Sequence, residues 1–186
     1  TFAKITGVNA IHKVINGILK ITALEGVECK INAVIMESTL DELEELVRFA
    51  TNIHAIRFIE RMPLSNDPVP FVSADTLLQK LESLGTVQRK TTSDTHVAAM
   101  YRFLPRWDKR AVINVGIIPA VSHRFCGKCN RLRVTSDGML RACLHDATEY
   151  NLKKILRGQL NDNIREVITN AVLHKKEGHS LMQCDD

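Results

Sequence analysis

Helical and strand patterns alternate through the first 85 residues of the chain, and this alternation constrains the fold more than any other feature. Apolar residues recur at helical spacing in VNAIHKVINGILKITALEG, STLDELEELVRFATN and SADTLLQKLESLG. The segments between them, VECKINAVIM and IHAIRFIERM, are short, apolar and rich in β-branched residues, as strands are. Strands joined by helical crossovers pair in parallel. The pattern predicts an α/β fold in which the strand over residues 27–36 has an open edge.

Local signals place the ends of these helices. Gly26 and Gly85 are predicted to end the first and third helices, because glycine readily adopts the backbone conformation that follows a helix. Thr39 and Glu42 have the spacing of a capping box, which predicts that the second helix begins near Thr39.

The second half of the chain has a different pattern. HVAAMYRFL and RAVINVGII are predicted strands, RLRVTSDGMLRACL is a predicted hairpin turning at Asp137–Gly138, and two helical segments follow, NLKKILRG and DNIREVITNAVLHKKEG. The Pro-rich MPLSNDPVP and the polar QRKTTSDT are candidate linkers. We therefore expect two domains, residues 1–85 and 86–186, the second of α+β type.

Composition narrows the classes of partner. The chain has 25 Lys and Arg against 21 Asp and Glu, a net charge of +4 that suits an anionic ligand. Aromatic residues make up only 5% and do not interleave with the basic segments, which disfavours nucleic-acid binding. TFAKITGVNA lacks the pattern of a secretory leader, and no apolar run has the length of a membrane span. We expect a cytoplasmic protein without a membrane or nucleic-acid partner.

Three of the five cysteines lie in one short segment, HRFCGKCNRLRVTSDGMLRACL. Cys126 and Cys129 have C-x2-C spacing, and the hairpin is expected to return Cys143 beside them even without a metal. Two kinds of metal site fit. Zinc would take His145 as a fourth ligand, in a Cys3His interaction module. An iron–sulfur cluster with three cysteines would leave one iron open to a substrate.

Two arginines follow the second cysteine. Arg131 and Arg133 alternate along the first predicted strand of the hairpin, so both should project to the same face as Cys129. Guanidinium groups match phosphate oxygens with two parallel hydrogen bonds. The pair therefore indicates either an anion site beside the metal or two solvated arginines on a strand face.

The pattern C-x2-C-N-R-L-R…C in FCGKCNRLRVTSDGMLRACL resembles the C-terminal cluster segment of the GTP 3′,8-cyclases, radical S-adenosylmethionine enzymes of molybdenum cofactor biosynthesis. The resemblance extends from IHKVINGI through CKINAVIM and IRFIERMP to the helix near His174, so it covers nearly the whole chain. It implies the last part of an incomplete (β/α) TIM-type barrel, followed by an α+β C-terminal domain that carries a cluster.

The resemblance also implies roles for the matching residues. It implies that a 4Fe-4S cluster, whose open iron binds the guanine of GTP, is held by Cys126, Cys129 and Cys143. The residues that it implies contact GTP are Lys30, Arg57, Arg131, Leu132 and Arg133. Met62 is the implied contact to S-adenosylmethionine, and no catalytic side chain is assigned to this chain.

In such enzymes a second 4Fe-4S cluster, held by C-x3-C-x2-C, cleaves S-adenosylmethionine to a radical that abstracts the ribose 3′ hydrogen. C3′ then attacks C8, which gives (8S)-3′,8-cyclo-7,8-dihydroguanosine 5′-triphosphate. The implied partners are GTP, the N-terminal half of the barrel, a second copy in a homodimer, and cyclic pyranopterin monophosphate synthase in the pathway.

This sequence departs from the family pattern at three places. It has no C-x3-C-x2-C, it ends in SLMQCDD without the family's Gly-Gly tail, and it carries His145 where a non-ligating residue is usual. It also starts without Met, within a helical pattern. We therefore expect the C-terminal part of a longer enzyme, inactive by itself.

Overall fold

The computed structural model describes residues 2–62, 70–91, 97–123, 126–175 and 178. Contacts divide the chain into two compact units, Thr1–His123 and Arg124–Asp186. Each unit is described separately below.

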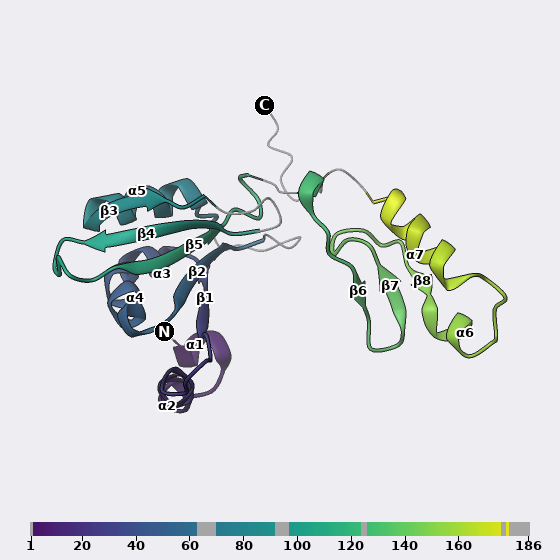
Figure 1. Cartoon of the computed structure of the whole chain (residues 1–186), viewed down its shortest axis with the longest axis horizontal. Coiled ribbons are helices and arrows are strands. Elements are labelled where there is room, and N and C mark those ends of the chain that lie inside the picture. The colour runs from purple at the N-terminus through teal and green to yellow at the C-terminus, as the bar shows by residue number, and fades with distance from the viewer. Residues whose placement is uncertain (1, 63–69, 92–96, 124–125, 176–177, 179–186) are drawn as a thin grey trace. The chain divides into compact units, whose positions relative to one another are not determined.

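The first unit is built on a sheet of five strands in the order β1-β2-β5-β4-β3 (Figure 1). The strands are β1 (Lys30–Ile35), β2 (Ala55–Glu60), β3 (Gly85–Arg89), β4 (Ala99–Pro105) and β5 (Ile113–Ile118). β1, β2 and β5 run parallel, whereas β4 is antiparallel to β5 and β3 is antiparallel to β4. The predicted α/β class with parallel pairing of the first two strands is confirmed, and the sheet as a whole is mixed.

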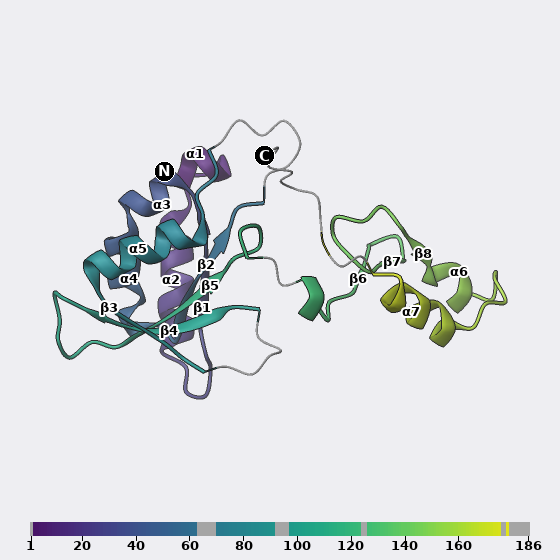
Figure 2. The ribbon, with the colours of Figure 1, turned by 90° about the horizontal axis from the view of Figure 1, so that it is seen from above.

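Helices pack against one face of this sheet (Figure 2). Those that contribute to its core are α3 (Glu37–Asp41), α4 (Leu43–Phe49), the 3₁₀ turn η1 (Ala50–Asn52) and α5 (Ala74–Leu84). The N-terminal helices are α1 (Phe2–Thr6) and α2 (Ile11–Thr22). The fully buried core lies between the sheet and helices α4 and α5, and its largest members include Leu43, Phe58, Leu77, Leu81 and Phe103. α2 contributes no buried residue.

The opposite face of the sheet carries several polar side chains. Along β1 the buried or half-buried Ile31, Ala33 and Ile35 alternate with exposed residues, as expected when one face of a strand is covered. The register places the residues of this second face side by side across the strands. We call it the polar face; its polar members are Lys30, Asn32, Arg57, Asn114, Arg102, Gln88 and Thr86, and Lys90 continues it past the end of β3.

The helix predicted over SADTLLQKLESLG is confirmed as α5, whereas the predicted capping role of Thr39 is wrong. Ser73 caps α5, since its hydroxyl accepts from Thr76 N at 3.1 Å, and the helix ends before Gly85 as predicted. Thr39, in contrast, lies inside α3. Its hydroxyl accepts from Met36 N at 3.2 Å and donates to Val34 O at 2.7 Å, which ties the helix to the end of β1.

The division into units lies after His123 and differs from the boundary expected between residues 85 and 86. The reason is strand pairing, because β5 fills the position beside β2 and carries the β4–β3 hairpin into the same sheet. The incomplete barrel remains a prediction.

The second unit is small and holds a three-stranded antiparallel sheet in the order β6-β7-β8. Its elements are the 3₁₀ turn η2 (Cys126–Lys128), β6 (Arg133–Val134), β7 (Met139–Arg141), β8 (Tyr150–Asn151), α6 (Leu152–Leu156) and α7 (Ile164–Leu173). The predicted turn at Asp137–Gly138 is confirmed, with Gly138 at a φ of +86°. The buried core of this unit is Leu140, Ala142, Leu152 and Ala171.

No helix within the described ranges is both long and apolar enough to cross a bilayer. The cytoplasmic location stays a prediction.

Candidate functional site

Arg57 lies in the middle of β2, at the centre of the polar face. It is flanked in register by Asn32 on β1 and Gly116 on β5, and Gly116 is flanked in turn by Met100 on β4. Arg57 Nε donates to Asn32 Oδ1 at 2.9 Å. This bond fixes the direction of the guanidinium across the β1–β2 pair.

Gly116 makes room for the Arg57 side chain. A Cβ placed on Gly116 would lie 2.8 Å from Arg57 Cγ, closer than real contacts allow, and 3.0 Å from Met100 Sδ, which is a tight contact. The aliphatic stem of Arg57 therefore occupies the space that any larger residue on β5 would fill. The sequence contained this signal, since a glycine inside the apolar strand INVGII marks a close approach, but Gly116 was not among the predicted site residues.

Lys30 begins β1 on the same face, and its ammonium is engaged by an acid. Lys30 Nζ pairs with Glu28 Oε2 at 2.8 Å, and His54 Nε2 lies 3.4 Å from the same oxygen. The hydrogen bond from Lys30, and then the charges of His54 and Lys30, hold the pKa of Glu28 below its usual range. A phosphate ligand of Lys30 would compete with this exposed carboxylate.

Two further cations of the polar face were not predicted from sequence. Lys90 extends the β3–β4 ladder by one position, since its N–H donates to Met100 O at 2.8 Å, and its ammonium donates to Asn114 Oδ1 at 3.2 Å. Arg102 is the register partner of Asn114 and is exposed. The five strands contribute no acidic side chain to this face, because Glu60 points to the helix side. The polar face therefore attracts anions.

The cysteine segment opens the second unit. Cys126 lies in η2, and Cys129 N donates to Cys126 O at 3.1 Å, so the C-x2-C pair is folded into one tight turn. Cys143 lies two residues beyond β7. All three cysteines are free thiols and half-buried.

The hairpin does not bring the three cysteines close enough to share a single metal ion. Among the described residues, no three Cys, His, Asp or Glu side chains lie close enough to hold one metal ion. The physical reason is the length of the ladder. β6 begins only at Arg133, so no strand carries Cys129 and Arg131 opposite Cys143, and the common strand face predicted for Cys129, Arg131 and Arg133 does not form.

The donor set nevertheless fits a cluster. In a four-iron cluster each thiolate binds its own iron, so the thiols need not share one ion, and cysteine thiolates are the usual ligands of such clusters. The Cys3His zinc set with His145 would require four side chains on a single ion. That these cysteines bind a metal, and which metal, stays a prediction.

Lys175, just after α7, contacts the cysteine turn and was missed by the sequence analysis. Its ammonium donates to Cys129 O at 2.8 Å, Cys129 Sγ at 3.3 Å and Arg131 O at 3.0 Å. Burial raises the pKa of Cys129, but the hydrogen bond from the Arg131 backbone, the hydrogen bond and charge of Lys175 and the charge of Arg131 together bring it below its ordinary value. The thiolate, which is the form that binds iron, is thereby favoured.

The other predicted residues lie as follows. Leu132 and Arg133 are exposed, and Arg133 begins β6. Met62 is half-buried, two residues beyond the end of β2. Lys30 and Arg57 share one face of the first unit, whereas Arg131, Leu132 and Arg133 belong to the second.

Comparison with known proteins supports the resemblance. The family model described as Molybdenum Cofactor Synthesis C matches residues 54–181. A protein named GTP 3′,8-cyclase from Peptoclostridium acidaminophilum is 33% identical over 187 residues, which cover 97% of this chain and 55% of the relative. A GTP 3′,8-cyclase from Corynebacterium glutamicum (strain R) is 33% identical over 160 residues, which cover 82% of this chain and 42% of the relative. The chain thus spans about half the length of these curated relatives. Because the family model matches more than half of it, the chain belongs to the Molybdenum Cofactor Synthesis C family.

Proposed function

We propose that this member of the family is the C-terminal part of a GTP 3′,8-cyclase, and that it supplies the GTP-binding half of the site and the second 4Fe-4S cluster. The observation that carries the proposal is the position of Arg57 on the polar face. Its guanidinium donates to Asn32, and its aliphatic stem fills the space over Gly116. Four cations, from Lys30, Arg57, Lys90 and Arg102, face one side of a sheet whose strands add no acid there. A triphosphate is an anion that suits such a face.

The residues of the first unit would bind and orient the triphosphate. Arg57 keeps part of its guanidinium fork for phosphate oxygens while Nε holds Asn32, so the side chain is directed before the ligand arrives. When GTP binds, the Lys30 ammonium would leave the Glu28 carboxylate and pair with a phosphate oxygen instead. Lys90 and Arg102 lie on the β4 side of Arg57 and would extend the contact along the chain of phosphates.

The residues of the second unit would hold the guanine end. Cys126, Cys129 and Cys143 would ligate a 4Fe-4S cluster, with Lys175 and the Arg131 segment favouring the Cys129 thiolate. When bound, this cluster supplies one open, Lewis-acidic iron for guanine. Arg131, Leu132 and Arg133 would contact GTP beside it.

The rest of the reaction would belong to the longer protein. A preceding half would carry the C-x3-C-x2-C cluster that cleaves S-adenosylmethionine, and Met62 would contact that cofactor at the end of β2. The parent enzyme would form 3′,8-cyclo-7,8-dihydroguanosine 5′-triphosphate, act as a homodimer and pass its product to cyclic pyranopterin monophosphate synthase.

Anaerobic reconstitution with iron and sulfide, followed by calorimetric titration with GTP, tests the proposal. We expect a coloured, oxygen-sensitive chain that binds GTP and forms no 5′-deoxyadenosine from S-adenosylmethionine. Arg57→Ala, or Arg131→Ala with Arg133→Ala, should weaken GTP about ten- to hundredfold, because each charge-assisted contact contributes about 1.5–3 kcal/mol. Lys80→Ala, an exposed lysine on α5, is the matched control. Equal GTP affinity in all variants would contradict the proposal, and stoichiometric zinc without colour would favour the Cys3His module.

A further inference from the structure

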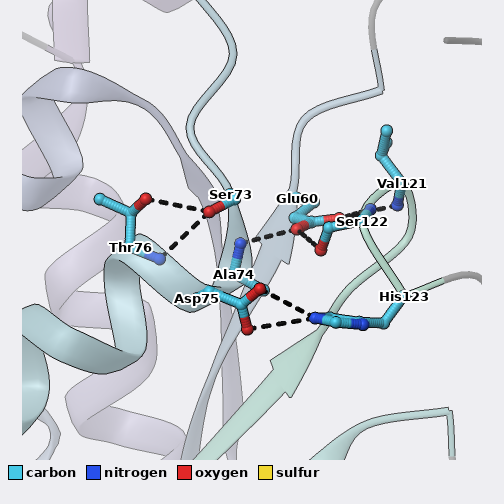
Figure 3. Close-up of polar contacts among 8 residues, drawn as sticks. All are labelled: Glu60, Ser73, Ala74, Asp75, Thr76, Val121, Ser122 and His123. Carbon is cyan, nitrogen blue, oxygen red and sulfur yellow. Dashed lines mark hydrogen bonds and ion pairs between the residues drawn. The ribbon is translucent and has the colours of Figure 1, made fainter. Parts of the chain in front are cut away.

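Glu60, the last residue of β2, is a buried carboxylate. Only 1% of its surface is exposed, and it lies on the helix side of the sheet, where its strand neighbours Ile56 and Phe58 enter the apolar core. A buried carboxylate is costly unless hydrogen bonds satisfy its oxygens. Figure 3 shows how Glu60 meets this requirement.

Four donors from two separate segments converge on Glu60 (Figure 3). Oε1 accepts from Ala74 N at 2.6 Å, at the first residue of α5, and also from the Ser122 hydroxyl. Oε2 accepts from Val121 N at 2.7 Å and Ser122 N at 2.8 Å. An ionised carboxylate is a pure acceptor and takes all four donors, which neither an amide nor an apolar side chain of this size would do.

A second contact joins the same two segments. His123 Nε2 lies 2.9 and 3.1 Å from the two carboxylate oxygens of Asp75, next to Ala74 on α5. This pair is exposed, with more than half of each side chain accessible, so it adds little energy by itself. Together the two contacts tie residues 121–123 to the start of α5.

The place of this contact in the chain gives it significance for function. Arg57 lies three residues before Glu60 and Met62 two residues after it, while His123 is the last residue of the first unit and precedes Cys126 by three positions. None of these four donors carries a charge, and they hold the carboxylate through backbone dipoles, the α5 N-terminus and one hydroxyl. Fully satisfied buried networks of this kind specify one arrangement of the segments they join.

We propose that Glu60 is a positioning residue that fixes where the chain leaves the first unit toward the cysteine segment. The inference rests on the proposed function, in which one GTP molecule is held at two points, its triphosphate by the polar face and its guanine by the cluster. Such two-point attachment gains affinity only when the connection restricts the distance between the points. The contacts of Glu60 hold residues 121–123, the end of the first unit, against β2 and the start of α5.

Glu60→Gln tests this without a change in side-chain size. The amide places an N–H₂ group against backbone N–H donors, so the contact to Ala74 or to residues 121–122 is lost. In the iron-loaded chain we expect the affinity for GTP to fall about tenfold or more, a part of the roughly 10²–10⁴-fold gain available from linked attachment. The affinity for inorganic triphosphate, which uses the polar face alone, should stay within about twofold on the same grounds.

Two further variants separate positioning from plain destabilisation. Ser73→Ala removes the cap of α5 but no donor to Glu60, so it should lower the melting temperature while keeping the ratio of GTP to triphosphate affinity. Ser122→Ala removes a single hydroxyl donor at an exposed residue, so we expect it to fold even where Glu60→Gln does not. It should lower the ratio of GTP to triphosphate affinity by a smaller factor. Amide exchange at Val121 and Ser122 should speed up in both Glu60→Gln and Ser122→Ala.

The outcomes are distinct. The first outcome is a wild-type chain that binds GTP more tightly than triphosphate, with the same ratio of the two affinities in Glu60→Gln and Ser122→Ala. It would show that Glu60 only stabilises the fold. A wild-type chain that binds GTP no better than triphosphate would overturn the two-point site, and with it the proposed function.

Discussion

Replacing Gly116 by Ala tests how the Arg57 side chain is positioned. Residue 116 carries no charge in either form, so it makes no charged contact with a ligand itself. The new methyl group would lie 2.8 Å from Arg57 Cγ and 3.4 Å from its Cδ, so the stem of Arg57 must rotate away from β5. Met100 Sδ at 3.0 Å blocks relief on the other side. The rotation would break the bond from Arg57 Nε to Asn32 Oδ1, now 2.9 Å, and misdirect the guanidinium.

The magnitude follows from the hydrogen bond to phosphate that a misdirected guanidinium can no longer make. One charge-assisted hydrogen bond is worth about 1.5–3 kcal/mol, so the affinity for GTP or triphosphate should fall roughly 10- to 150-fold. The stability cost should lie near the lower end of the ~1–3 kcal/mol range for overpacking, because the atoms that must move belong to flexible side chains. Calorimetric titration with triphosphate measures the first quantity and thermal unfolding the second.

Gly17→Ala is the matched control. Gly17 lies within α2 with no heavy atom within 4 Å of its would-be Cβ, so alanine should stabilise the helix by about 0.5–1 kcal/mol and leave triphosphate binding unchanged. The double variant Gly116→Ala with Arg57→Ala should bind no more weakly than Arg57→Ala alone. Additive losses of affinity would refute the reasoning, since they would mean that Gly116 acts independently of Arg57.

Three further predictions concern the cysteine turn and the sheet edge. Cys143→Ser should abolish iron incorporation, measured as iron per chain after anaerobic reconstitution; full iron content would remove Cys143 from the ligand set. Lys175→Met removes a hydrogen bond and a positive charge from Cys129, so its pKa should rise and its thiolate fraction at neutral pH should fall. Slower alkylation of Cys129 by iodoacetamide in the metal-free chain, read by mass spectrometry, would show this, and Lys175→Arg should retain most of the wild-type rate. β1 pairs only with β2 in the described sheet, so the isolated chain should self-associate through its free edge, and Val34→Lys should reduce the mass seen by light scattering; a wild-type monomer at all concentrations would contradict it.

The regular elements followed from local patterns, and the site residues that were missed depended on tertiary contacts. The strands around Lys30, Arg57 and Met100 were predicted because β-branched and apolar residues cluster there. Helix α5 was predicted because its apolar residues recur at helical spacing and Gly85 ends it, and both are local signals. Thr39 carried the same kind of signal, but its hydroxyl bonds back to Val34 O across the end of β1, which no window of sequence shows.

The site shows the same division. Arg57, Lys30 and the cysteines belong to recognisable motifs and were found by type and spacing. Lys175 was missed because it follows an ordinary helix, 46 residues from Cys129, and only the packing of α7 brings its ammonium to that sulfur. Glu60 was missed because a glutamate at a strand end normally faces water, and its donors at Val121 and Ser122 come from about 60 residues further on.

The topology of the first unit also limits where a barrel could continue. β5 has β2 on one side and β4 on the other, and β4 is antiparallel, so the parallel series cannot grow past β5. A further parallel strand has to join β1, whose outer edge is unpaired in the described sheet. The neighbouring surface fits that role. α2 has no buried residue, and an apolar cavity of about 410 Å³ lies between Ile15 and Ile18 of α2, Leu46 of α4 and the strands β1 and β2. The apolar side of α2 is not fully buried within the unit, so this surface is suited to pack against a further element. A strand paired with β1 at this edge would extend the polar face beside Lys30 and Asn32.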